Sequence, residues 1–394
     1  MVTVSQPAAL VPDERPPSPE PRISSPVTRY RSLNAWRGFA CIAVVLHHAS
    51  GAMMLRNPEL ASLAVFKVCQ FGYFGVPIFF VISGYCIANS ACTDMASRAG
   101  VRYFAISRMR RILPPYWLSA LAYALLKLVI LLLVAAGWAR PGSLASDNSV
   151  RGDILYYLSN ATLTQYVFHR GFISPVFWTL CYEAAFYLIV GCAMLMAWRN
   201  KRALLHILYA TTLSCILLAI MAPAGGAIYP LDLWPQFGLG VLVYDLATGS
   251  RARNRRAQVW GGLIALGFLA EASLHKFSTA PLTGGGTFAA AIGFAILIAL
   301  LHRADPQLGR NPVNWLVAKV GKVSYSLYLT HYLVLALLLK ILWPSLLGSH
   351  PYGSLLFLAA VPIALAPLFF RALEQPFMAS PRKTPLGCLP FNDH

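Results

Sequence analysis

The strongest constraint on the fold is a series of apolar runs, each close to twenty residues long, separated by polar connections. A helix of this length matches the hydrocarbon thickness of a bilayer. The 394 residues are 57% apolar and 12% charged, with a mean hydropathy of +0.59, which excludes an ordinary soluble domain. We therefore expect an all-α polytopic membrane protein with about ten transmembrane helices, over residues 33–54, 69–91, 114–137, 173–197, 203–222, 233–248, 258–274, 284–302, 323–343 and 353–373.

The basic residues gather in alternate connections between these runs. The chain has 32 Lys and Arg against 14 Asp and Glu, a formal charge of +18. Alternate connections place 24 basic residues on one side of the membrane and six on the other. Because cytoplasmic loops carry the excess of Lys and Arg, this bias predicts that both termini are cytoplasmic. It also argues against a nucleic-acid partner, since the charge is divided among loops rather than gathered on one solvated face.

The ends of the chain differ in composition from the apolar region. Residues 1–32 are rich in proline and contain no continuous apolar run, which predicts a disordered cytoplasmic tail. Residues 33–377 form the expected membrane domain, and residues 378–394 a second cytoplasmic tail. The eight cysteines show no Cys-x-x-Cys or Cys/His spacing, so no metal is expected.

The first apolar run contains two ionisable residues, Arg37 and His48, and His48 follows a second histidine, His47. A charge at the centre of a membrane helix costs about 2.5 to 3.5 kcal/mol on the insertion scale, so such residues commonly mark a reaction site or pathway. Eleven residues turn a helix through roughly 1100°, about 20° from three full turns, with a rise of about 16 Å. We therefore expect Arg37 and His48 to share one helix face.

A basic cluster precedes the third run. Arg108 and Arg111 are three residues apart and share one side if helical, which suits bidentate recognition of a phosphate. Arg110 lies between them. An anchoring role in a cytoplasmic loop explains the same arginines without a ligand.

Two further polar groups interrupt apolar runs. Glu183 is a lone carboxylate, and either a catalytic role or a structural pairing with Arg37 would account for it. The run that begins at Ser324 carries Tyr325 and His331, which either contact a substrate or link neighbouring helices.

These segments together resemble the membrane acyltransferase 3 family, whose members O-acylate glycans, lipopolysaccharide, Nod factors and macrolides. The resemblance covers residues 33–377 and rests on six motifs in order. They are the Arg-Gly opening with a histidine eleven residues after the arginine, Phe79-Phe80-Val81-Ile82-Ser83-Gly84-Tyr85, Arg108-x-x-Arg111 followed by Ile-Leu-Pro-x-Tyr-Trp, Trp178-Thr179-Leu180-x-Tyr-Glu183, Ser324-Tyr325-Ser326-Leu327-Tyr328-Leu329-x-His331, and Glu374-x-Pro376.

The resemblance implies an integral-membrane O-acyltransferase. It selects His48 over His47 as the essential histidine, assigns functions to Arg37, Arg108 and Arg111, and places Ser83 and Gly84 at the floor of the pocket. The expected donor is a cytosolic acyl-CoA, and acetyl-CoA is the favoured candidate. Arg108, Arg111 and Arg110 are expected to hold its phosphates.

The expected chemistry leaves two routes open. His48 acts either as a general base on the acceptor hydroxyl or as an acyl carrier, and Arg37 and Glu183 complete the expected catalytic group. The acceptor approaches from the outer side, where the connection 138–172 supplies Tyr166, and Tyr325 and His331 are further expected substrate contacts. The acceptor is an extracytoplasmic glycan, glycolipid or small glycosylated molecule.

A proton-coupled transporter or lipid flippase is the alternative function. His48, His331 and Glu183 would then form a proton relay, and the arginines would bind an anionic substrate. The family resemblance implies a multi-pass protein of the bacterial inner membrane. The sequence leaves the acyl group, the acceptor and the oligomeric state open.

Overall fold

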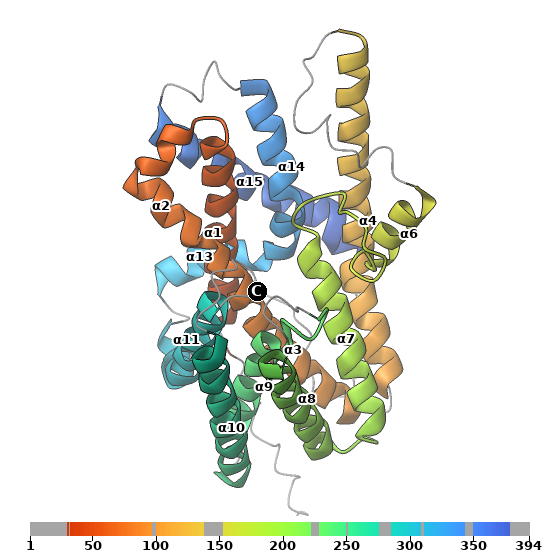
Figure 1. The fold of residues 1–394 in the computed structure, drawn as a ribbon, viewed down its shortest axis with the longest axis vertical. Coiled ribbons are helices and arrows are strands. Elements are labelled where there is room, and N and C mark those ends of the chain that lie inside the picture. The colour runs from red at the N-terminus through yellow and green to blue at the C-terminus, as the bar shows by residue number, and fades with distance from the viewer. Residues whose placement is uncertain are drawn as a thin grey trace, which may run out of the picture.

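The computed structural model describes residues 30, 32–96, 100–137, 153–221, 228–249, 251–275, 285–308, 311–342 and 350–378, and within these ranges it contains helices and no strand (Figure 1). The longer helices are α1 (Leu33–Met54), α3 (Gly75–Ala96), α4 (Gly100–Ala135), α7 (Trp178–Met196), α8 (Lys201–Met221), α9 (Trp234–Thr248), α10 (Arg251–His275), α11 (Gly285–Leu301), α14 (Ser324–Leu342) and α15 (Pro351–Phe369). The shorter ones are α2 (Ala64–Gln70), α6 (Ile154–Thr162), α12 (Asp305–Leu308), α13 (Pro312–Lys322), the 3-10 turns η1 (Pro58–Ser62), η2 (Phe71–Phe74), η4 (His302–Ala304) and η6 (Gln375–Phe377), and the π turn η5 (Phe370–Glu374).

The structure confirms a polytopic all-α membrane protein. Each of the ten expected runs overlaps one of the longer helices. In the described ranges, six helical stretches are long and apolar enough to cross a membrane, namely Ala64–Met95, Gly100–Ala135, Trp178–Met196, Lys201–Met221, Ser324–Leu342 and Pro351–Phe377. The count of ten spans and the cytoplasmic position of both termini stay predictions.

Helix α4 begins earlier than its apolar run. The run was expected from residue 114, but the helix starts at Gly100 and continues through Pro114 and Pro115. Prolines are tolerated inside membrane helices because neighbouring groups and local adjustments satisfy the freed backbone carbonyls. Arg108 and Arg111 consequently lie on this helix, and their three-residue spacing places them on one side of it.

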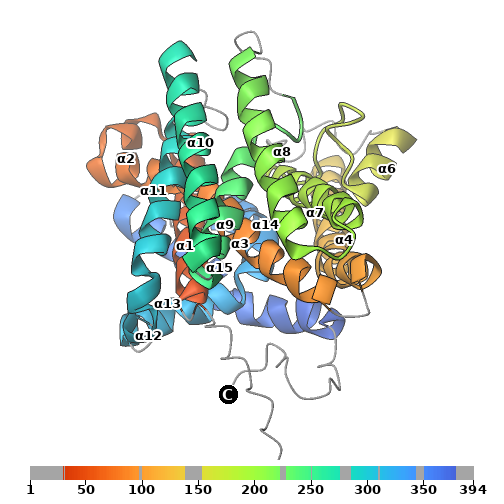
Figure 2. The same cartoon turned by 90° about the horizontal axis from the view of Figure 1, so that it is seen from below.

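The helices pack around aromatic and small side chains. α8, α9, α10 and α11 lie at one end of the molecule, and α1, α2, α14 and α15 lie at the other (Figure 1). α3 contacts both α1 and α9 and so joins the two groups (Figure 2). Phe186, Trp234 and Phe237 are fully buried in the largest core cluster, and their rings meet at centroid distances of 4.8 to 5.5 Å.

Glycines allow two pairs of helices to cross backbone against backbone. A Cβ on Gly84 of α3 would overlap the carbonyl oxygen of Phe237 of α9, and a Cβ on Gly240 would overlap that of Val81. Gly38 of α1 and α13 show the same close approach. Small residues at such crossings let helices approach closely in membranes, where packing replaces the hydrophobic effect as the driving force.

The N-terminal end of the described chain packs against distant helices. The Tyr30 hydroxyl donates to the carbonyl oxygen of Ile298 at 2.7 Å, and the Ser32 N–H donates to Asp305 Oδ1 at 2.8 Å. Both residues are buried, although they fall within the expected tail. The rest of that tail, apart from these two residues, and positions 379–394 lie outside the described residues.

Candidate active site

Two histidines from distant parts of the chain meet in the interior. α1 carries both Arg37 and His48, as the sequence predicts. The His48 ring lies 5.3 Å from that of His331 on α14, centroid to centroid, with the ring planes inclined by 37°. His47 and Tyr332 also approach the His48 ring, at 5.1 and 5.6 Å. His48 is half-buried and His331 fully buried, so His48 stands between a buried imidazole and a more accessible one.

A cluster of charged groups lies near the other end of α1. Arg37 and Arg111 are within electrostatic range of each other and of Glu183 and Glu374. Both arginines are half-buried. Across the part of the chain that the structure describes, neither makes a hydrogen bond, and neither has a carboxylate within 4.0 Å. Like charges partly removed from water without a direct counter-ion favour an anionic ligand.

Glu183 is held by hydroxyl groups. Its Oε1 accepts a hydrogen bond from Ser83 Oγ at 2.6 Å and another from the Tyr187 hydroxyl at 2.7 Å. Glu183 lies within electrostatic range of Arg37, and the two groups form no ion pair within 4.0 Å.

The three expected donor-binding arginines of α4, Arg108, Arg110 and Arg111, separate into two groups. Arg108 is half-buried, donates to Ser90 Oγ, and lies with its guanidinium carbon 5.9 Å from the Tyr187 ring centroid. Arg111 lies on the same side of the helix. Arg110 is exposed because a two-residue step turns the helix by about 200°. The structure thus brings Arg108 and Arg111 to the cluster and leaves Arg110 outside it.

Glu374 is a member of the cluster to which the sequence assigned no role. It is buried in the π turn that follows α15, and its Oε2 accepts from Ser326 Oγ at 2.8 Å. The sequence does contain a signal for this residue, because Glu374 is a carboxylate at the end of the last apolar run. Tyr325 also lies in electrostatic contact with Arg111, and its hydroxyl donates to the carbonyl oxygen of Ile112 at 2.8 Å. π turns recur at functional sites, which agrees with this position.

Ser83 and Gly84 face different neighbours. Ser83 contacts Glu183 and so belongs to the charged cluster. Gly84 lies at the crossing with α9, against the backbone of Phe237. Its place in the structure is that of a helix-packing residue.

Tyr166 lies in an aromatic group away from the histidines. Its ring stacks on Tyr229 at 4.8 Å with planes 17° apart, and meets the edge of Tyr182 at 5.3 Å. Tyr182 in turn donates to Asp232 Oδ2 at 2.9 Å. None of the contacts recorded for Tyr166 among the described residues reaches His48.

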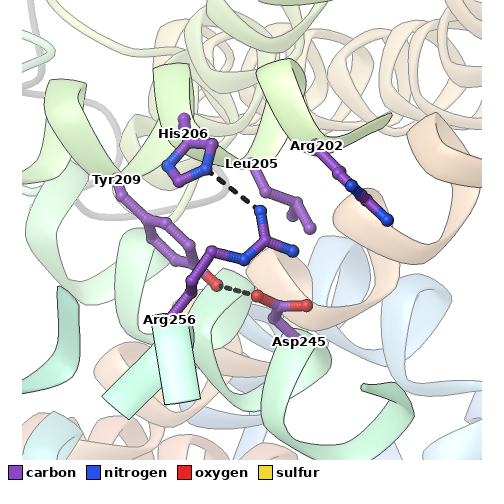
Figure 3. A pocket seen from close by; sticks show the side chains of 6 residues that line it. All are labelled: Arg202, Leu205, His206, Tyr209, Asp245 and Arg256. Carbon is purple, nitrogen blue, oxygen red and sulfur yellow. Dashed lines mark hydrogen bonds between the residues drawn. The ribbon is translucent and has the colours of Figure 1, made fainter. Parts of the chain in front are cut away.

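A small pocket lies between the ends of α8, α9 and α10 (Figure 3). Arg256 Nη1 lies 3.2 Å from His206 Nε2 in it, and the Tyr209 hydroxyl donates to Asp245 Oδ2 at 2.9 Å. Its free volume is about 10 Å³, roughly that of one water molecule. It includes none of the expected site residues and is too small for an acyl donor.

The described part of the chain is thus a helical membrane bundle with a charged cluster near one end of α1 and a histidine pair near the other. The chain belongs to the acyltransferase 3 family, because that family's model, described as an acyltransferase domain, matches residues 30–369. The expected family and the expected enzyme class, an acyltransferase, are both confirmed.

Three curated proteins illustrate the similarity. The chain is 25% identical over 383 residues to the peptidoglycan O-acetyltransferase OatA of Listeria monocytogenes, covering 88% of this chain and 55% of that protein. It is 25% identical to the putative peptidoglycan O-acetyltransferase YrhL of Bacillus subtilis, covering 87% and 54%. It is 28% identical to the putative membrane-bound transacylase BcsY of Komagataeibacter xylinus, covering 78% and 73%. The chain therefore spans about half the length of OatA and of YrhL. No solved structure matches.

Proposed function

We propose that the chain transfers an acetyl group from cytosolic acetyl-CoA to a hydroxyl of an extracytoplasmic glycan. The names of two relatives refer to O-acetylation of peptidoglycan, which supports an acetyl group and a glycan acceptor. The proposal includes ten spans, as the apolar runs predict, and cytoplasmic termini, as the distribution of basic residues predicts. The bacterial inner membrane is what the family resemblance implies. A glycolipid or a small glycosylated molecule fits the same chemistry.

The observation that carries the proposal is the pair of guanidinium groups, Arg37 and Arg111, that lack a close counter-ion. They suit the diphosphate of CoA. Arg37 and His48 are separated by about 16 Å along α1. The pantetheine arm has about thirteen bonds between phosphorus and sulfur, equal to roughly four extended residues or about 14 to 16 Å. A donor anchored at the arginines therefore reaches the level of His48 with its thioester.

The other residues of the charged cluster have different roles in the proposed donor site. Arg108 adds a third positive group beside Arg111, and Glu183, fixed by Ser83 and Tyr187, limits the repulsion among the arginines. Tyr325, on α14, lies within electrostatic range of Arg111, and its hydroxyl is hydrogen-bonded to the carbonyl oxygen of Ile112.

The transfer can follow either of two routes. In direct transfer, His48 accepts the hydroxyl proton, the oxygen attacks the thioester carbon, the carbon–sulfur bond breaks, and the thiolate takes the proton. In the two-step route, His48 first carries the acetyl group and CoA leaves as the thiol, and the hydroxyl then attacks the acyl-imidazole. The acceptor enters from the outer side, where the stacked Tyr166 and Tyr229 offer an aromatic surface for a sugar ring.

Transfer of label tests the proposal. Membranes that contain the protein are incubated with acetyl-CoA labelled in the acetyl group, and label is measured in peptidoglycan, polysaccharide and lipid fractions, with membranes lacking the protein as control. Ester-linked label only in the first sample supports the proposal. Movement of label or of a lipid across the membrane without ester formation would favour the transporter alternative. Failure with acetyl-CoA and with longer acyl-CoAs would reject the donor.

Replacement of Arg111 tests the donor site. We expect Arg111→Ala to raise the KM for acetyl-CoA about 10 to 100-fold, because a hydrogen bond to a charged group contributes roughly 1.5 to 3 kcal/mol. Arg102→Ala, an exposed position on the same helix, is the matched control and should change the KM less than about twofold. The measurement is the initial rate of transfer against donor concentration. Equal KM values for the two variants would remove Arg111 from the donor site.

A further inference from the structure

The orientation of the buried His331 ring follows from its two backbone partners. His331 Nδ1 lies 2.8 Å from the carbonyl oxygen of Tyr328 and 3.1 Å from that of Leu327. A carbonyl oxygen only accepts hydrogen bonds, so Nδ1 must carry the hydrogen. In the neutral ring the second nitrogen, Nε2, is then unprotonated and presents its lone pair.

That lone pair has no partner. His331 has no exposed surface, and Nε2 makes no hydrogen bond within the described residues. Leaving a buried acceptor unsatisfied costs about 1 to 3 kcal/mol, so each such atom calls for an explanation, and a catalytic role is one of those that apply. His331 thus has an unprotonated ring nitrogen without a hydrogen-bond partner among the described residues.

The nearest functional group is His48. The two rings are close, at 5.3 Å between centroids, yet no hydrogen bond joins them. A substrate hydroxyl that reaches the His48 ring therefore also comes close to the His331 ring. The His47 ring, which also approaches His48, differs because its Nδ1 is hydrogen-bonded to the carbonyl oxygen of Gln70 at 3.0 Å and the residue is only half-buried.

We infer that His331 is a second catalytic residue in the two-step route, in which His48 carries the acetyl group and His331 Nε2 accepts the proton of the acceptor hydroxyl. This inference rests on the proposed function and refines it. The hydroxyl oxygen forms its bond to the acyl carbon as the proton moves to His331 Nε2. The bond between the acyl carbon and the His48 nitrogen breaks, and that nitrogen takes the proton from His331.

Two amide variants separate catalysis from structure. His331→Asn places an amide N–H where Nδ1–H now donates to Leu327 and Tyr328, and removes Nε2. His331→Gln instead places an amide at the position of Nε2, which accepts a hydrogen bond but does not take a proton. We expect both to lower kcat about 10² to 10⁴-fold, the usual contribution of a general base. The KM for acetyl-CoA should change less than about threefold, because the arginine cluster is untouched.

The control is His47→Asn, which makes the same change in the neighbouring imidazole and should keep kcat within a few-fold of the wild type. Size-exclusion profiles and thermal midpoints in detergent check that each variant folds. The inference is overturned if either folded His331 variant keeps more than a tenth of the wild-type kcat, or if the loss appears in the donor KM instead of kcat. Wild-type membranes that transfer no acetyl group would overturn the proposed function itself and this inference with it, which is a different outcome from an active wild type with an active His331 variant.

Discussion

His48→Ala is expected to reduce acetyl transfer by about 10² to 10⁴-fold at unchanged protein level, whichever route the reaction follows. His48 lies beside His331 and is the half-buried member of that pair, so a substrate that reaches the site meets it first. Alanine keeps the helix and removes the imidazole, and the packing loss is limited because the ring is only partly enclosed. The measurement is ester-linked label per amount of protein in the membrane.

His47→Ala is the matched control for His48. The residues are adjacent, both are half-buried, and both are histidines, but only His48 contacts the His331 ring. His47 instead joins α1 to α2 through the carbonyl oxygen of Gln70. We expect His47→Ala to retain transfer within about tenfold. Equal activity of the wild type and both variants would remove His48 from the chemistry.

Gly240→Ala is expected to destabilise the helical bundle strongly. The added Cβ would overlap the carbonyl oxygen of Val81, which belongs to the backbone of α3 and moves only if the helix moves. Overpacking of this kind costs typically 1 to 3 kcal/mol and more where backbone is involved, so we expect about 3 kcal/mol or more. Size-exclusion chromatography and thermal unfolding in detergent measure the effect. Gly84→Ala, on the facing helix, should act in the same way.

Gly191→Ala provides the comparison. Gly191 lies inside α7, and a Cβ there would meet no atom within 4 Å. Replacing a helical glycine by alanine in open space is expected to stabilise by about 0.5 to 1 kcal/mol. If Gly240→Ala and Gly191→Ala give the same thermal midpoint, the α3–α9 crossing is not as close as described.

The sequence was sufficient for the features that depend on one helix at a time. Apolar runs of bilayer length predicted the long helices, since a membrane segment must satisfy its backbone hydrogen bonds internally. Helical periodicity placed Arg37 with His48 on α1 and Arg108 with Arg111 on α4, because the angle between two residues of one helix depends only on their spacing. The same periodicity shows, once α4 is known to be helical at this point, why Arg110 points away.

The tertiary structure decided every relation between helices. The sequence by itself did not bring His331 to His48, pair Glu183 with Ser83 and Tyr187, or place Glu374 in the arginine cluster. Nor did it show that Gly84, which the family resemblance places at the pocket floor, lies at a helix crossing. Membrane helices are apolar on most faces, so their hydrophobic pattern does not indicate which face meets a partner and which meets lipid. That choice depends on close backbone approach and on hydrogen bonds between side chains from distant segments, which exist only after the helices have packed.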